Sequence, residues 1–164
     1  MNETEAFCVI DIIQRFQRQL GQIADRQRNL LVITPYQGQI RFLKRTLAQY
    51  DHDQPSKIRV EVATADSCIG READIVILSL VRSNTTGQLG FMEDDEKRAL
   101  VMLSRETEYL FIFGDISLYS TSELWKNVFR EFRRARSLET REIRDVHELK
   151  RSVDRLTKTN EQEI

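Results

Sequence analysis

The sequence lacks the features of disulfide scaffolds, membrane proteins and secreted proteins. It holds two cysteines in 164 residues, Cys8 and Cys68, with neither the number of a disulfide framework nor the spacing of a metal site. No apolar run approaches the roughly 20 residues that span a bilayer. The first five residues are acidic, whereas a secretory signal would begin with basic ones. We therefore expect an intracellular protein, nuclear or cytoplasmic, with no membrane contact.

A surplus of charge of one sign is also missing. Lys and Arg number 25 and Asp and Glu 26, so the formal net charge is −1 and no overall field attracts nucleic acid. Any surface for nucleic acid must therefore be local. The two histidines, His52 and His147, have no cysteine or carboxylate at ligand spacing, so the sequence predicts no metal site of its own.

The phosphate-binding loop of nucleotide hydrolases is absent as well. None of the six glycines opens a Gly-x-x-x-x-Gly-Lys-Ser/Thr loop, whose amides cradle a triphosphate and whose hydroxyl holds magnesium. Asp94-Asp95-Glu96 follows a turn rather than an apolar strand, so we interpret it as a helix start and not as the acidic metal-binding pair of a motor. Without Walker A and B, we expect the chain alone to be inactive as an ATPase.

What the sequence does contain is a regular alternation of strands and helices. Apolar periodicity predicts helices over 4–27, 36–50, 94–105 and 122–132, and strands over 30–33, 58–62, 74–81 and 109–114. Such alternation is typical of an α/β domain of three layers, a mostly parallel sheet with helices on both faces. We expect this domain to occupy residues 1–132.

The composition changes after Phe132. Residues 133–164 are dense in both charge signs and contain no glycine, proline or aromatic residue. Apolar residues recur there at intervals of three and four: Ile143, Val146, Leu149, Val153 and Leu156. The pattern predicts a charged amphipathic helical tail, frayed at its end.

Three polar loops border the expected strands. They are Thr34-Pro35-Tyr36-Gln37-Gly38-Gln39, Gly70-Arg71-Glu72 and Ser104-Arg105. Because each lies beside a parallel strand, we expect all three to open at the same edge of the sheet. Binding and catalytic residues of α/β proteins gather at such an edge.

At these loops the sequence resembles the second, C-terminal RecA-like domain of Upf1-like superfamily 1 helicases, the DNA2/NAM7 type. Residues 32–39 look like motif IV, 64–79 like motif V and 97–105 like motif VI, in the order and spacing of the family. The resemblance covers about residues 5–132. It implies a RecA-like P-loop NTPase fold.

The resemblance also implies a nucleotide site shared with a first RecA-like domain. Arg105 matches the arginine finger, whose preplaced guanidinium stabilises the charge that builds on the phosphoryl oxygens. Gly70, Arg71 and Glu72 match the motif V residues that approach nucleotide. The alternative from the residues alone is a surface arginine at a helix end and a tight turn closed by an Arg71–carboxylate pair.

For nucleic acid, the resemblance implies contacts from Thr34, Pro35, Tyr36 and Thr64. Hydroxyl and amide groups at strand ends can hold the sugar–phosphate backbone without reading sequence. The alternative is that these residues only cap helices and pack the core. RNA or DNA single strands, bound weakly by the chain alone, are the expected partners.

Some positions depart from the family pattern. Cys68 and Ile69 replace an aromatic residue and a glutamine, Leu100 replaces an asparagine, Met102 an alanine, and Thr107 a basic residue. Two hypotheses therefore stand. In the first, the chain is half of an ATP-dependent RNA or DNA helicase and uses ATP with magnesium only beside a phosphate-loop domain. In the second, it is a degenerate, helicase-derived protein-interaction module without catalysis. Nucleic-acid binding without ATP is a third possibility.

Overall fold

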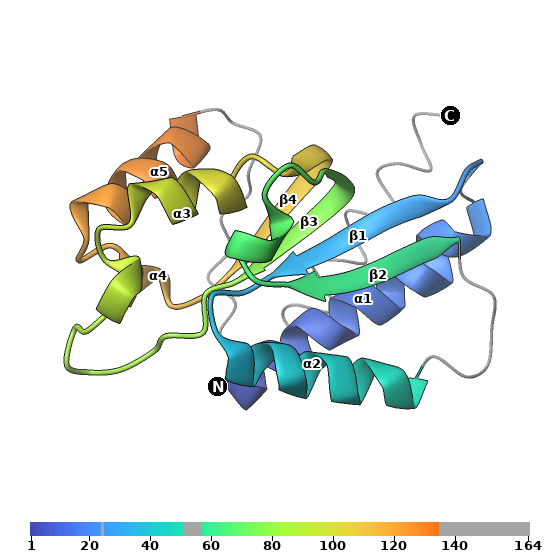
Figure 1. The fold of residues 1–164 in the computed structure, drawn as a ribbon, viewed down its shortest axis with the longest axis horizontal. Coiled ribbons are helices and arrows are strands. Elements are labelled where there is room, and N and C mark those ends of the chain that lie inside the picture. Colours follow the sequence, from blue (N-terminus) through green and yellow to red (C-terminus); the bar gives the residue numbers. More distant parts are fainter. Residues whose placement is uncertain (24, 51–56, 135–164) are drawn as a thin grey trace.

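A computed structural model describes residues 1–23, 25–50 and 57–134, and its centre is a four-stranded sheet (Figure 1). The strands are β1 (Arg28–Ile33), β2 (Ile58–Ala63), β3 (Ala73–Ser79) and β4 (Glu106–Phe113). Their spatial order is β2-β1-β3-β4, and every neighbouring pair is parallel. The sheet therefore needs a crossover between each consecutive pair of strands, as the alternating pattern predicts.

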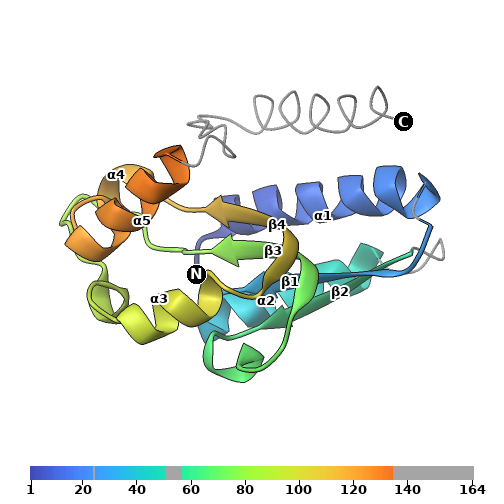
Figure 2. The same cartoon turned by 90° about the horizontal axis from the view of Figure 1, so that it is seen from above.

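Helices cover both faces of this sheet. Helices α1 (Glu3–Ile23) and α2 (Gln37–Tyr50) lie on one side, and α3 (Glu96–Met102) and α5 (Glu123–Arg134) lie on the other, together with the short α4 (Ile116–Tyr119) (Figures 1 and 2). Two 3₁₀ turns, η1 (Asp66–Cys68) and η2 (Gly90–Met92), belong to this second side. The expectation of a three-layer RecA-like α/β fold is confirmed.

The two halves of the core meet at the central strand β3. All seven of its residues are buried. Ile75 and Ile77 pack with α1 and α2, whereas Val76 and Leu78 pack with α3 and α5, because side chains of a strand alternate between the two faces. Burial on both sides explains why β3 is a continuous apolar run rather than an alternating one.

The bounds of α3 and β4, on either side of Arg105, differ from the sequence-based expectation. Helix α3 starts at Glu96, after Asp95 caps it by accepting a hydrogen bond from the Arg98 amide at 3.0 Å, and it ends at Met102. Strand β4 then begins at Glu106, earlier than expected, and lies at the edge of the sheet. Its residues are half-buried or exposed, because among the described residues no strand pairs with its outer side.

The expectation that the three polar loops share one edge is wrong. Thr34 and Thr64 follow the carboxyl ends of β1 and β2, whereas Gly70-Arg71-Glu72 precedes β3 and Arg105 precedes β4. In a parallel sheet, a loop that enters a strand lies opposite to a loop that leaves one. The molecule therefore has two candidate surfaces. We call the side where the strands begin, with Gly70-Arg71-Glu72 and Arg105, the amino edge, and the side where they end, with Thr34 and Thr64, the carboxyl edge.

Within the described ranges, no helix is long and apolar enough to cross a bilayer, and no three His, Cys, Asp or Glu side chains converge as metal ligands would. The amphipathic tail expected over residues 133–164 lies outside the described residues from residue 135 onward.

Candidate functional site

At the amino edge, Arg105 joins the loop before β4 to the loop before β3. Its guanidinium donates to the Arg71 carbonyl at 3.3 Å, and its own carbonyl accepts from the Ala73 amide at 2.9 Å. A second guanidinium nitrogen donates to the Ser104 hydroxyl at 2.9 Å. These contacts hold together two segments that lie 34 residues apart in the chain.

The charge of Arg105 is not neutralised by these contacts. Among the described residues, no carboxylate forms an ion pair with Arg105, and its buried Nε has no hydrogen-bond partner. The neighbouring Glu106 forms no ion pair with Arg105, and its buried Oε2 has no hydrogen-bond partner among the described residues. An orphaned donor on a permanently charged group fits a site that is completed by an anionic ligand.

Gly70 shapes the loop beside Arg105. Its φ of +75° lies in the left-handed region, and a Cβ built there would meet no atom within 4 Å. Glycine is therefore required by the backbone conformation rather than by crowding. The turn is closed by the Arg71 amide, which donates to the Cys68 carbonyl at 3.1 Å.

Arg71 and Glu72 line a hollow of about 240 Å³ at this edge. Arg71 pairs there with Glu61 of β2, an ion pair between two half-exposed side chains. The structure thus contains the turn with an Arg71–carboxylate pair that the residues alone suggested. Arg105 does not line this hollow. Its guanidinium is linked to the Gly70-Arg71-Glu72 loop through the hydrogen bond to the Arg71 carbonyl.

The residues that depart from the family pattern lie close to this loop. Cys68 is fully buried, its thiol donates to the Ala65 carbonyl at 3.0 Å, and burial raises the pKa of that thiol. Ile69 and Leu100, in contrast, expose 67% and 68% of their surface. Two large apolar side chains therefore face solvent in the segments that flank Arg105.

At the carboxyl edge, the residues expected to contact nucleic acid differ in accessibility. Thr34 is fully buried and its Oγ1 lacks a hydrogen-bond partner among the described residues. Pro35 and Thr64 line a hollow of about 230 Å³, whose other lining residues are Gln37, Ala65, Asp66, Phe91 and Arg98. The structure therefore brings Pro35 and Thr64 together at one surface and places Thr34 beneath it.

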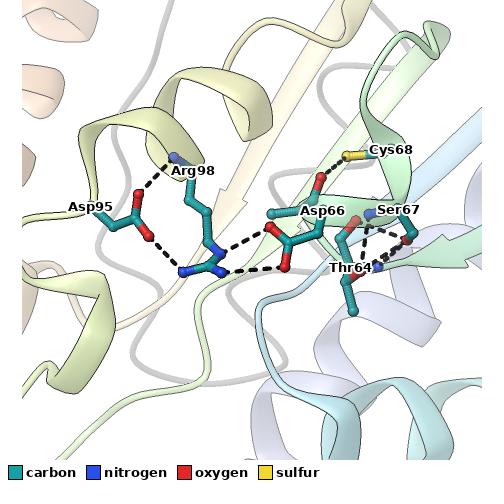
Figure 3. A network of polar contacts seen from close by, with 7 residues as sticks. Thr64, Asp66, Ser67, Cys68, Asp95 and Arg98 are labelled. Atoms are coloured by element: carbon teal, nitrogen blue, oxygen red, sulfur yellow. Dashed lines mark hydrogen bonds and ion pairs between the residues drawn. The ribbon is translucent and has the colours of Figure 1, made fainter.

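Three residues that line this hollow, Thr64, Asp66 and Arg98, belong to a polar network (Figure 3). The Ser67 amide donates to Thr64 Oγ1 at 3.1 Å, and the Thr64 amide donates to Ser67 Oγ at 2.9 Å. From α3, Arg98 reaches across to the Asp66 carboxylate at 3.1 Å while a second nitrogen contacts Asp95 at 2.6 Å. Thr64 is thus held by local capping, as the alternative interpretation of this residue proposed.

Sequence reasoning missed a buried carboxylate behind this edge. Glu5 of α1 is 8% exposed and accepts hydrogen bonds from the Ser79 hydroxyl at 2.6 Å and from the Val81 amide at 3.0 Å. Burial raises the pKa of Glu5 to about 7. Glu5 lies one helical turn before the buried Val9, and this position on the apolar face of α1 was the one signal that could have revealed it.

Glu5 and its neighbours tie α1 to α2 and to the end of β3. Gln39 donates to the Ser79 hydroxyl at 3.2 Å and to the Asn2 carbonyl at 3.1 Å. Val81, a β-branched residue, has a φ of +71°, a conformation that costs about 1–3 kcal/mol for a residue of this type. The carboxylate of Glu5 holds the Val81 amide and so stabilises this strained turn.

Comparison with known proteins shows where this arrangement recurs. Residues 1–117 match the family model AAA_12, described as an AAA domain. A "Regulator of nonsense transcripts 1 homolog" from Neurospora crassa is 36% identical over 134 residues, which are 81% of this chain and 12% of the relative.

Two relatives from Saccharomyces cerevisiae carry helicase names. "DNA polymerase alpha-associated DNA helicase A" is 33% identical over 66% of this chain and 15% of its own length. "ATP-dependent helicase NAM7" is 37% identical over 62% of this chain and 10% of its own length. The chain therefore spans about a tenth to a seventh of these relatives, and it belongs to the AAA_12 family as a helicase domain of the Upf1-like superfamily 1 group.

Proposed function

We propose that the chain is the second RecA-like domain of an ATP-dependent helicase, which completes an ATP site only beside a first domain that bears a phosphate loop. One observation carries this proposal: Arg105 is held by backbone and hydroxyl contacts at the amino edge with its positive charge unpaired. A guanidinium kept free of carboxylates is suited to stabilise a transferring phosphoryl group.

The residues around Arg105 fit a share of a nucleotide site. The left-handed Gly70 turn and the exposed Glu72 carboxylate flank Arg71, whose carbonyl accepts from Arg105, and Glu72 offers oxygens that could accept from a ribose hydroxyl. When bound, ATP with magnesium would supply the phosphoryl group, and this chain would supply charge and position. The phosphate loop itself must come from the partner domain.

The carboxyl edge would carry the nucleic-acid strand. Pro35 and Thr64 line an open hollow there, next to Tyr36. Because the two edges lie at opposite ends of the strands, nucleotide and nucleic acid could be held at the same time without competing for space. A motor that couples ATP turnover to movement along a strand needs such separation. Whether the strand is RNA or DNA is decided by groups beyond these residues.

The test is ATP turnover by this chain mixed with a phosphate-loop domain taken from one of the helicase relatives. We expect no turnover by the chain alone, turnover in the mixture, and a loss of about 10³-fold with Arg105→Ala. Arg130→Ala, which removes an exposed arginine of α5 that donates to Asn127 and forms an ion pair with Glu131, is the matched control and should leave turnover unchanged.

A second candidate function is a protein-interaction module without catalysis. The exposure of Ile69 and Leu100 favours it, because apolar side chains flanking a binding loop suit a protein partner better than a solvated nucleotide. Absence of turnover with every phosphate-loop partner, together with absence of strand binding at low salt, would contradict the motor and leave this module as the function.

A further inference from the structure

Two aromatic rings and two arginines from distant parts of the chain meet at the carboxyl edge. Tyr36 follows β1 and Phe91 lies in η2, and their ring centroids are 5.2 Å apart with the planes inclined at 56°. The guanidinium of Arg82 lies 5.4 Å from the Tyr36 ring centroid and its Nε donates to the Tyr36 hydroxyl at 3.0 Å. Arg98 of α3 lies 5.4 Å from the Phe91 ring.

Phe91 is exposed because the residues next to it in the chain are anchored in the core. Its ring is 46% exposed, although a phenylalanine gains more by burial than almost any other residue. The residues on either side of the turn are anchored: Leu89 and Met92 are fully buried in the core beneath α5. Gly90, with a φ of +63°, permits the sharp turn between them. The exposed ring is therefore fixed in place by its neighbours.

The hollow in front of Phe91 suits a flat and largely uncharged group. Phe91, Arg98, Pro35 and Thr64 all line this hollow, which measures about 230 Å³. Both carboxylates near Arg98, those of Asp66 and Asp95, pair with it, so its charge is balanced locally. A phosphate would find little net attraction there, whereas Phe91 keeps 46% of its surface exposed.

The polar lining narrows the class of ligand further. Gln37 and Asp66 place an amide and a carboxylate at the rim, beside the apolar face of Phe91 and Pro35. A nucleobase combines a π face with an edge of donors and acceptors, and base–aromatic stacking is the usual sequence-tolerant contact with single strands. An apolar peptide side chain would offer the Gln37 amide no hydrogen-bond partner.

We infer that Phe91, supported by Tyr36 and Arg98, is a stacking platform for one base of a single strand whose backbone passes over Pro35 and Thr64. The inference rests on the proposed binding of nucleic acid at the carboxyl edge and adds a residue that none of the motif resemblances assigns. Arg82 and Arg98 act as positioning residues, because they hold the two rings and do not themselves stack on the base.

The test compares two short strands of equal length, an oligouridine and the same backbone without bases, in direct binding measurements at low salt. Wild type should prefer the strand with bases by about tenfold. Phe91→Ala should lose that preference while its affinity for the abasic strand stays unchanged, and Phe91→Trp should keep it. Phe7→Ala removes a similarly exposed ring of α1, which contacts Phe42, and should behave as wild type.

Each other result overturns the inference in a distinguishable way. If Phe91→Ala retains the preference, or weakens the binding of both strands equally, the base does not stack on this ring, while the proposed binding of nucleic acid at the carboxyl edge still stands. If wild type binds neither strand at low salt, the proposed function of the carboxyl edge fails together with the platform. Thermal unfolding of each variant should match wild type, since Phe91 is surface-exposed.

Discussion

The two edges of the sheet use their charged residues in opposite ways. At the amino edge Asp74 is stabilised as an anion, because its carboxylate accepts from Arg26 at 2.5 Å and from the Asn29 amide at 2.7 Å, and these contacts lower its pKa. At the carboxyl edge the burial of Glu5 outweighs its hydrogen bonds to Ser79 and Val81 and the attraction of the N-terminal ammonium, and its pKa rises to about 7. One edge is therefore built to keep a charge and the other to shed one.

The largest expected effect on stability is at Glu5. A carboxyl group whose folded pKa lies above its unfolded value of 4.5 stabilises the fold below that value, and this contribution is lost as pH rises through about 7. We expect up to about 3 kcal/mol of loss across this window. Urea unfolding at about pH 5 and about pH 7.5 should reveal it as a difference between wild type and Glu5→Gln.

Glu5→Gln is a sharp comparison because its side-chain oxygen can still accept from Ser79 or Val81. The variant should gain stability relative to wild type at the higher pH and show no such gain at the lower one. Equal pH profiles for the two proteins would show that the buried carboxyl group does not titrate in this window.

The next effect, of opposite sign in pH, is at Asp74. Because contacts with Arg26 lower its folded pKa, Asp74 stabilises the fold above its ordinary value of 3.8, and this contribution is lost as pH falls. Asp74→Asn should cost about 1 kcal/mol near neutral pH, since half of the Arg26 side chain is exposed to solvent. The cost should shrink in acid, measured by urea unfolding. A cost that is constant with pH would contradict the charged interaction.

The smallest effect separates two glycines. Gly70→Ala places a Cβ on a left-handed residue and should cost about 1 kcal/mol. Gly38→Ala is the matched control in the first turn of α2, where φ is not in the left-handed region and the nearest atom to a new Cβ is 3.7 Å away. It should be neutral or slightly stabilising by helix propensity. Equal thermal shifts would show that the Gly70 turn relaxes freely.

The sequence carried most of the fold but not the placement of its loops. The continuous apolar run of β3 and the spaced apolar residues of α1 and α2 each follow from local periodicity, so these elements were predictable. The expectation that Gly70 and Arg105 share an edge with Thr34 was wrong, although the order of loops and strands in the sequence is enough to separate them in a parallel sheet. A loop that precedes a parallel strand and a loop that follows one lie at opposite ends of the sheet.

Other features of the site depend on contacts that no local pattern encodes. One hydrogen bond of the Glu5 network, between Glu5 and Val81, joins residues 76 positions apart. The aromatic pair of Tyr36 and Phe91 forms only because β1 and η2 meet at the carboxyl edge. The edge position of β4 follows from the strand order β2-β1-β3-β4, which an apolar strand sequence cannot specify by itself. Long-range geometry of this kind decides which polar groups converge.

The length of β3 sets how the two edges can influence each other. Seven residues at about 3.3 Å each separate the edges by about 20 Å, beyond the Debye length of about 8 Å in physiological salt. Charge at one edge is therefore screened from the other. Any influence of one edge on the other must therefore be mechanical and pass through β3, which is buried on both faces and densely packed. A displacement of the Gly70 turn would be transmitted along this strand to Ser79, Val81 and the groups that they hold.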